Sequence, residues 1–390
     1  MRLCVFICAL LVRLIAVELT GAGKTDFGDA PDYLASARSV CAQHVYPERG
    51  NLPFFRAPGV PFFILAVTAC HPSAIRIVKY GLAACDALSV LLIYLLTERL
   101  YSRRTAILAA VLATFHPFFV GAVTDIRSEP LFMALLLLAF WLVVRGNPAL
   151  AGVAVALSAL TRPTGLLVVP LLALFVFVRS RKAALLLVLA AALTLAPWTL
   201  RNYVRFHELI AVNDAGGFNL WRGTHPELLR IVRLRNRAEF ARASLQFESV
   251  TVAETARLVD ARASTPKTRD REWQRLAIAQ FRRDPVRPTL WKAAAFWRPW
   301  LHPAEYGRAM VVLSAVVSIG LFVLGAIGLA RYPDRRLALA VVAFFVVMWL
   351  AHVPYIPTIR LRTPLVDPLL IVFGAGALSA LMESVRRRSA

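Results

Sequence analysis

The residues best suited to chemistry are carboxylates and arginines beside long apolar segments. Asp29 and Tyr33 follow the first apolar segment, Arg56 stands in an aromatic, Arg and Pro stretch over 55–61, and Glu129 opens a later segment. Similarly placed polar residues are Asp26, Asp32, Asp125, Arg127, Arg162, Arg201, Asn202, Arg360 and Arg362. A carboxylate can take a proton from a hydroxyl group, and a guanidinium can neutralise a phosphate. The pattern therefore favours transfer of a group from an anionic phosphate to a hydroxyl acceptor.

Two structural explanations compete with this chemistry. A carboxylate such as Asp29, at the start of a helix, caps free N–H groups. Arginines at a membrane surface also bind lipid headgroups or extend toward water. Capping explains one acid at residue 29, but it does not predict Glu129, which is framed by Asp125 and Arg127. For each single arginine, both explanations stay open.

The composition indicates an integral membrane protein. The chain has 390 residues, of which 58% are hydrophobic, whereas soluble domains average about 45–50% apolar. Its mean hydropathy is +0.62. The excess lies in runs long enough to span a bilayer, which predicts a polytopic bundle with about ten membrane helices. The predicted segments are 2–20, 77–97, 105–124, 130–144, 148–161, 164–178, 183–199, 309–330, 336–353 and 364–382.

The formal charge of +22 does not require a nucleic-acid partner. Many basic residues form short clusters between apolar segments, as they do in the cytoplasmic loops of membrane proteins. The clusters are at 99–104, 145, 179–182, 331–336 and 386–388. The loops that carry these clusters alternate along the chain with the remaining loops, so the positive-inside rule assigns the clusters to the cytoplasm. Both termini are then inside, which requires an even number of spans. The outer loops are then 21–76, 124–129, 161–164, 200–308 and 354–362.

Two shorter segments are expected to lie in the membrane interface. Residues 29–45 place Tyr33, Leu34 and Ala37 at helical spacing, which predicts an amphipathic helix. The apolar stretch 58–70 is too short to span and is interpreted as an interfacial or re-entrant helix. The domains are thus 1–202 with the first outer loop, a small folded extracytoplasmic region over 203–308, and C-terminal membrane helices over 309–390. The first segment is read as an uncleaved span.

Four other positions, Cys41, Cys70, Arg13 and Asp86, leave alternatives open. Cys41 and Cys70 share one outer loop, so they could pair in an oxidising compartment, although two separate thiols are favoured. Arg13 and Asp86 lie inside predicted spans, where charges are usually paired. Either they form an ion pair, or Arg13 extends toward the interface while Asp86 faces a polar cavity. Lysines occur only at 24, 79, 182, 267 and 292, and this Arg bias suggests a GC-rich bacterial genome.

The order of motifs resembles the GT-C membrane glycosyltransferases, in the branch related to protein mannosyltransferases and lipid A aminoarabinose transferase. The resemblance covers most of the chain apart from about 230–285. It rests on Asp29 and Tyr33 before an Ala-rich helix, Arg56-x-Pro58-Gly59-x-Pro61, Ser128 to Phe132, Leu160 to Pro163, Pro197-Trp198-x-x-Arg201-Asn202, residues 216–223 and, loosely, Arg360, Pro364 and Pro368. Relatives often carry extra spans and a C-terminal outer domain.

The resemblance implies a polyprenyl-phosphate sugar donor and an inverting, single in-line displacement. By matching position, Asp29 is the acid of the first outer loop and Glu129 the second acid. The expected substrate-binding residues are Tyr33, Arg56, Arg127, Arg162, Arg201, Asn202 and Arg362. Asp29 would act as the base or orient the acceptor. The sequence identifies no cofactor, and it leaves a divalent cation near the acids undecided.

The leading hypothesis is therefore a glycosyltransferase of the bacterial cytoplasmic membrane that acts at the outer face. Its partners would be a polyprenyl-linked donor, membrane lipids and a lipid, glycan or protein acceptor, with no nucleic acid. The alternative is a transporter or flippase for a lipid-linked glycan. Transporters place polar residues at the membrane midplane and often contain inverted repeats, whereas these polar residues gather at one face. A noncatalytic assembly protein of the same fold is a third possibility, disfavoured by the presence of both Asp29 and Glu129.

Overall fold

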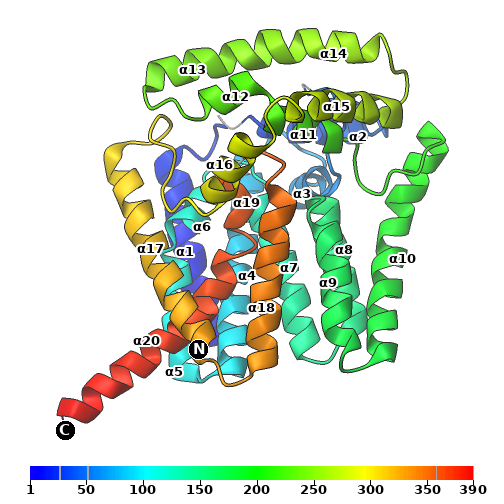
Figure 1. Cartoon of the computed structure of the whole chain (residues 1–390). Helices are drawn as coiled ribbons and strands as arrows, with labels where there is room; N and C mark the ends of the chain where they lie inside the picture. The colour runs from blue at the N-terminus through cyan, green and yellow to red at the C-terminus, as the bar shows by residue number, and fades with distance from the viewer. Residues whose placement is uncertain (26–27, 51, 357, 390) are drawn as a thin grey trace.

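Long, roughly parallel helices form a bundle, and shorter helices cover one of its ends (Figure 1). This computed structural model describes residues 1–25, 28–50, 52–356 and 358–389. Within these ranges the regular elements are helices and none is a strand, which confirms the predicted all-α class. The bundle contains α1 (Arg2–Thr20), α4 (Ile75–Leu100), α5 (Arg103–Thr114), α6 (Pro117–Ala122), α7 (Glu129–Val144), α8 (Pro148–Thr161), α9 (Gly165–Phe177), α10 (Arg181–Phe206), α17 (Arg308–Arg331), α18 (Arg335–His352) and α20 (Asp367–Ser389).

All ten predicted apolar segments are helical, but their lengths differ. In the described part of the chain six helices are long and apolar enough to cross a membrane, namely α1, α4, α10, α17, α18 and α20. The helices α7, α8 and α9 are apolar but shorter. A multi-pass membrane protein follows from these lengths and compositions, while the count of ten spans stays a prediction.

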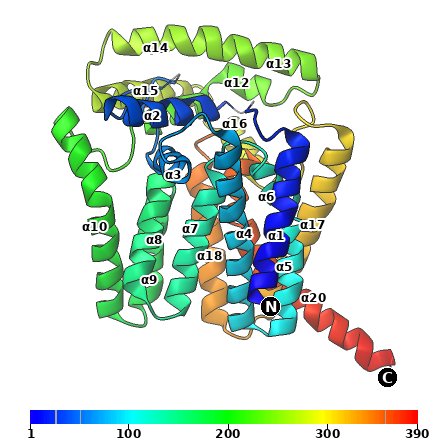
Figure 2. The same cartoon turned by 180° about the vertical axis from the view of Figure 1, so that it is seen from behind.

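Polar caps define the turns at the uncovered end of the bundle. Ser102 begins α5 by accepting a hydrogen bond from the backbone N–H of Thr105, and Ser180 begins α10 in the same way. Asp334 caps α18 by accepting from the N–H groups of Arg336 and Leu337. Side-chain oxygens at these positions satisfy N–H groups that the first helical turn leaves free. The capped, basic turns and both chain termini lie at the same end of the bundle (Figures 1 and 2).

This arrangement gives a testable topology. We expect cysteines introduced at Arg230 and Arg335 to react with a membrane-impermeant maleimide from opposite sides of the membrane. The background chain should lack the free thiols Cys4, Cys8 and Cys85. Residue 335 lies in a basic turn, whereas 230 lies in the covering helices, so the positive-inside rule assigns them to opposite sides. Labelling of both from the same side would refute the orientation.

The predicted segment 105–124 is broken into α5 and α6. The break falls at Phe115 and His116, directly before Pro117, which has no N–H and disfavours a helical conformation in the residue before it. Arg13 donates hydrogen bonds to backbone carbonyls at the end of α5, next to the break. Its guanidinium donates to the backbone oxygens of Ala113, at 3.0 Å, and Thr114, at 2.7 Å.

The same arginine forms a buried ion pair within the bundle. Its Nε lies 2.7 Å from Oδ2 of Asp86, and both side chains are fully buried. Of the alternatives left open by the sequence, the ion pair is therefore the one observed. Arg13 thus joins three helices, because it stands on α1, pairs with α4 and supports the break after α5.

We expect Arg13→Met to lower the stability of the protein strongly. The substitution leaves Asp86 buried without its counter-charge, and breaking such a pair typically costs about 3–5 kcal/mol. Removing both charges in Arg13→Met/Asp86→Leu should cost less than the single change. Thermal or denaturant unfolding of the purified protein in detergent measures both. Wild-type stability in the single variant would contradict the structural role of the pair.

The helix α10 continues beyond the predicted end of its apolar segment. It runs through Pro197 to Phe206, so the predicted domain boundary at 202/203 falls inside a helix. Two side chains of its last turns hold the following loop. Nε1 of Trp198 donates to the carbonyl of Val212 at 2.7 Å, and Nδ2 of Asn202 donates to that of Ile210 at 2.9 Å. These contacts explain why polar residues extend the helix past the apolar run.

The covering layer consists of α2 (Ala30–Gln43), α3 (Gly59–Thr68), α11 (Gly216–Thr224), α12 (Pro226–Ile231), α13 (Arg237–Gln246), the π-helix η1 (Phe247–Val252), α14 (Ala253–Asp260), α15 (Pro266–Phe281) and α16 (Val286–Phe296). The elements α13, η1 and α14 form the outermost helix (Figure 1). The covering layer has an aromatic core in which Trp221, Phe247 and Trp273 are all buried. Phe54 of the first loop joins this core, so the loop and the 203–308 region pack as one layer.

A disulfide fastens the first loop. Cys41 in α2 and Cys70, just after α3, are bonded, with Cα atoms 5.8 Å apart. The favoured expectation of two separate thiols was wrong, because proximity between helices cannot be read from spacing. The bond closes a loop that contains Arg56 and thereby limits the conformations available to that loop when the chain unfolds.

Candidate active site

Asp29 lies at the start of α2 but does not cap it. Its side chain makes no capping hydrogen bond. One carboxylate oxygen, Oδ1, lies 3.0 Å from Nη2 of Arg56, and the other, Oδ2, lies 3.0 Å from Nη2 of Arg360. The carboxylate is thus held between two guanidiniums, and ion pairing replaces the capping explanation.

Glu129 is the first residue of α7 and is connected to Asp29 by the same arginine. Arg360, in the short helix α19 (Ile359–Arg362), donates through Nε to Oε1 of Glu129. Nη1 of Arg162 lies 3.2 Å from the same oxygen. Oε2 of Glu129 is buried without a hydrogen-bond partner among the described residues. Arg360 therefore bridges the two acids through Oδ2 of Asp29 and Oε1 of Glu129.

The loop between α2 and α3 positions Arg56. Its guanidinium donates to Oδ2 of Asp32 through Nε at 3.0 Å and Nη2 at 2.9 Å. It also lies over the ring of Tyr33, 5.5 Å from the centroid, and over that of Phe54 at 5.1 Å. The backbone N–H of the neighbouring Phe55 donates to Asp214. We call Asp29, Asp32, Arg56, Glu129, Arg162 and Arg360 the acid–arginine cluster.

The cluster holds Asp29 in its ionised form. Burial alone would raise the pKa of Asp29, but the charges of Arg360 and Arg56 outweigh it and hold the pKa below its ordinary value. For Arg360, burial opposes the charge, yet Glu129 and Asp29 raise its pKa. Three carboxylates face three guanidiniums through these pairs. An anionic group that enters must compete with the carboxylates for the same donors.

Arg162 and Arg127 both act on Glu129, and their expected role in binding substrate stays a prediction. Nη1 of Arg162 lies 3.4 Å from Oγ of Ser128, and its guanidinium is over the ring of Phe132. The charge of Arg127 acts on Glu129. Thr25 donates to Asp125 at the edge of this group. Asp26 lies outside the described residues.

Arg201 and Asn202 occupy a different environment from the acids. The guanidinium of Arg201 donates to the carbonyl of Tyr46 at 2.9 Å and stacks near Trp198 and Phe206. Asn202 is fully buried and donates to a loop carbonyl. Its amide holds the chain after α10, and the expectation that Asn202 binds substrate stays a prediction. Tyr46 connects Arg201 to the cluster, because its hydroxyl donates to the carbonyl of Arg56.

Arg362, also expected to bind substrate, is engaged within the protein. Its side chain is fully buried, with Nε 3.1 Å from Oδ1 of Asp367 and Nη1 2.8 Å from the carbonyl of Arg298. It therefore ties α19 to the start of α20. Arg360, two residues earlier, points into the cluster instead. Both arginines stand in the same outer turn and are separated by a single leucine. Their spacing therefore did not predict which of the two side chains faces the acids.

A bound metal ion would need carboxylates or other ligands free to converge. In the described part of the chain no group of three His, Cys, Asp or Glu side chains has a suitable arrangement. Between Asp29 and Glu129 the positive charge is supplied by Arg360. A divalent cation near the acids stays a prediction.

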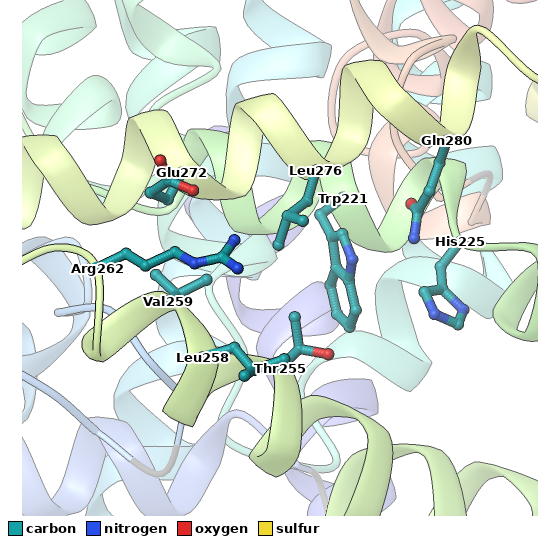
Figure 3. A pocket seen from close by; sticks show the side chains of 9 residues that line it. All are labelled: Trp221, His225, Thr255, Leu258, Val259, Arg262, Glu272, Leu276 and Gln280. Atoms are coloured by element: carbon teal, nitrogen blue, oxygen red, sulfur yellow. The ribbon is translucent and has the colours of Figure 1, made fainter.

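A separate cavity lies in the covering layer between α14 and α15 (Figure 3). Its volume is about 210 Å³. Trp221 and His225, whose rings are 4.9 Å apart, line one side, and Glu272, Leu276 and Gln280 approach from α15. The cavity shares no lining residue with the acid–arginine cluster. The convergent charges that suit group transfer are thus those of the cluster.

Comparison with known proteins supports the resemblance seen in the sequence. Residues 55–200 match the family model of dolichyl-phosphate-mannose-protein mannosyltransferases. This segment contains Arg56, Glu129 and Arg162 of the cluster. No curated protein sequence matches the chain.

Solved structures of membrane glycosyltransferases share the fold. The apo oligosaccharyltransferase of Archaeoglobus fulgidus aligns with a TM-score of 0.56 and 17% identity, covering 100% of this chain and 51% of that one. The same enzyme in complex with an inhibitory peptide and a dolichol-phosphate gives 0.50 and 15%, with the same coverage. ArnT from Cupriavidus metallidurans bound to undecaprenyl phosphate gives 0.45 and 15%, covering 96% and 77%.

The chain spans about half the length of the oligosaccharyltransferases it matches. The resemblance predicted from the sequence is confirmed: the chain has the GT-C fold of membrane glycosyltransferases, and its residues 55–200 match the dolichyl-phosphate-mannose-protein mannosyltransferase family.

Proposed function

We propose that the protein transfers a sugar from a polyprenyl-phosphate donor to a hydroxyl-bearing acceptor at the outer face of the bacterial cytoplasmic membrane. The observation that carries this proposal is the bridge Asp29–Arg360–Glu129 at the covered end of the bundle. It brings two acids and several guanidiniums to one place, as transfer from an anionic phosphate requires. The match to the mannosyltransferase family supports the same reaction class.

The donor phosphate would bind to Arg56 and Arg360. Both guanidiniums are now paired with Asp29, and a phosphate is an equally suitable bidentate partner. When the phosphate takes these donors, Asp29 loses much of the positive charge that lowers its pKa. The carboxylate then becomes a stronger base at the moment when the donor is in place, because a general base works best with a pKa near the working pH.

In this mechanism the acceptor hydroxyl attacks the anomeric carbon while the bond from that carbon to the phosphate oxygen breaks. Asp29 takes or orients the hydroxyl proton, and the leaving polyprenyl phosphate keeps the bonding electron pair. Arg360 and Arg56 neutralise the charge that develops on the phosphate. A single displacement of this kind inverts the anomeric centre. Glu129 holds Arg360 in position and presents Oε2 to the acceptor or the sugar.

The class of donor is supported by the archaeal oligosaccharyltransferase, which has been captured with a dolichol-phosphate. A polyprenyl phosphate is an anion on a long apolar chain, so it would reach the cluster from the bilayer beside the covered end. The transporter or flippase alternative expects its polar groups near the middle of the bundle. The mid-bundle pair of Arg13 and Asp86 is sealed from solvent and engaged, which favours the enzyme.

Transfer in vitro tests the proposal directly. Purified protein in vesicles should move a radiolabelled sugar from a polyprenyl phosphate to a cell-envelope extract, with release of polyprenyl phosphate. In cells, deletion should remove one sugar from an envelope glycan, glycolipid or glycoprotein while the polyprenyl-linked donor accumulates. Unchanged donor and product pools in the deletion strain, together with movement of intact donor across vesicles, would support the flippase instead.

A further inference from the structure

A large apolar cavity lies at the uncovered end of the bundle, away from the acid–arginine cluster. Its volume is about 690 Å³, within the range of about 300–1,000 Å³ typical of sites for organic ligands. Residues from α4, α7, α9, α18 and α20 line it, including Val144, Phe175, Val341 and Phe373. These helices belong to the apolar bundle, so the cavity is lined mostly by hydrocarbon side chains.

Basic side chains mark one end of this cavity. Arg179, just after α9, and Arg336, in the first turn of α18, both line it and are both exposed. The carboxylate of Asp334 also lies there, but it is engaged as the cap of α18. These residues belong to the basic turns at the end that carries both termini (Figures 1 and 2). A basic rim on an apolar cavity between membrane helices is the arrangement that binds an anionic lipid headgroup with its chain inside.

The two halves of α18 differ in their contacts: the C-terminal half is held by hydrogen bonds, whereas the first half borders the cavity. Near its C-terminal end, Nε1 of Trp349 donates to the carbonyl of Ala293 at 2.9 Å, and His352 lies 3.4 Å from Oγ1 of Thr164. Its first half borders the cavity, where it reaches α7 through the contact of Phe344 with Phe140. An apolar cavity of this size is costly to fill with water, so hydrocarbon is the physically favoured filling.

We propose that the cavity binds an anionic phospholipid from the leaflet at the basic end, with its phosphate at Arg179 and Arg336 and an acyl chain between α7, α9 and α18. The lipid completes the packing of the first half of α18. The other end of this helix leads to α19 and thus to Arg360, so the lipid supports the element that precedes the bridging arginine. This inference does not rest on sugar transfer.

Lipid titration of the purified full chain tests the site. Native mass spectrometry should detect tighter binding of phosphatidylglycerol than of phosphatidylcholine to the wild type. The double variant Arg179→Gln/Arg336→Gln should bind phosphatidylglycerol about thirtyfold more weakly. The matched control Arg104→Gln/Arg386→Gln removes the same charge from exposed basic positions that do not line the cavity, and it should bind like the wild type.

A second variant separates the cavity from the charge. Ala340 lines the cavity, so Ala340→Phe should fill part of it and weaken binding while both arginines remain. Wild-type binding by the double variant and by Ala340→Phe would overturn the proposal, as would equal affinity for phosphatidylcholine. Binding of polyprenyl phosphate in place of phosphatidylglycerol, with the same dependence on Arg179, Arg336 and Ala340, would reassign the site to the carrier lipid. None of these outcomes requires a transfer assay, so they are independent of the proposed reaction.

Discussion

Asp29→Asn is expected to reduce sugar transfer by about a hundredfold or more, in protein that reaches the membrane at normal abundance. Asparagine keeps the size of the side chain and its single carbonyl oxygen can still accept a hydrogen bond from Arg56 or Arg360, but it cannot take a proton. Because Asp29 makes no capping hydrogen bond, the substitution removes no cap from α2. Initial rates with a labelled polyprenyl-phosphate sugar measure the effect.

The matched control is Asp260→Asn, which removes an acid that pairs with Arg49 in the exposed part of the covering layer. That variant should transfer at the wild-type rate. If Asp29→Asn protein also transfers at nearly that rate, Asp29 only neutralises its arginines, and Glu129 becomes the better candidate for the base.

Arg360→Gln is expected to lower transfer on the order of a hundredfold, the size of effect seen when one donor to a developing negative charge is removed. The substitution also takes away the cation between Asp29 and Glu129. The pKa of Asp29 is lowered most by Arg360, so its removal should raise that pKa. Residual activity should then increase with pH over a range in which the wild type is already constant.

Two further variants distinguish chemistry from folding. Arg360→Lys should recover part of the lost activity, because lysine keeps the charge but loses the planar fork that can hold both acids. Arg362→Gln should instead act on stability, since breaking its buried pair with Asp367 typically costs about 3–5 kcal/mol. A normal pH profile and rate in Arg360→Gln would remove Arg360 from the site, whatever its effect on unfolding.

The helices and the general position of the chemistry could be predicted from the sequence because both depend on local patterns. Apolar runs gave all ten bundle segments, and helical spacing gave α2. Asp29, Arg56, Glu129 and Arg162 were singled out because they stand at the ends of apolar segments, and the structure brings these four together. Residues at the same end of adjacent helices in a bundle are brought close together by the packing of the helices.

The remaining contacts depend on which way a side chain faces and on partners far along the chain. Arg360 and Arg362 differ by two residues, yet one faces the acids and the other is buried against Asp367. Asn202 matched a motif but serves a loop carbonyl. The break before Pro117 is supported by Arg13, about a hundred residues away in sequence. No short-range pattern contains such information, and the pairing of Cys41 with Cys70 is a further example.

The bridge between Asp29 and Arg360 joins residues 331 positions apart in the chain. During synthesis the N-terminal helices, with Asp29, Arg56 and Glu129, are therefore inserted long before their bridging cation has been translated. Until then Asp29 and Glu129 lack the guanidinium that pairs with both of them. The acid–arginine cluster is therefore complete only after α19 has been translated.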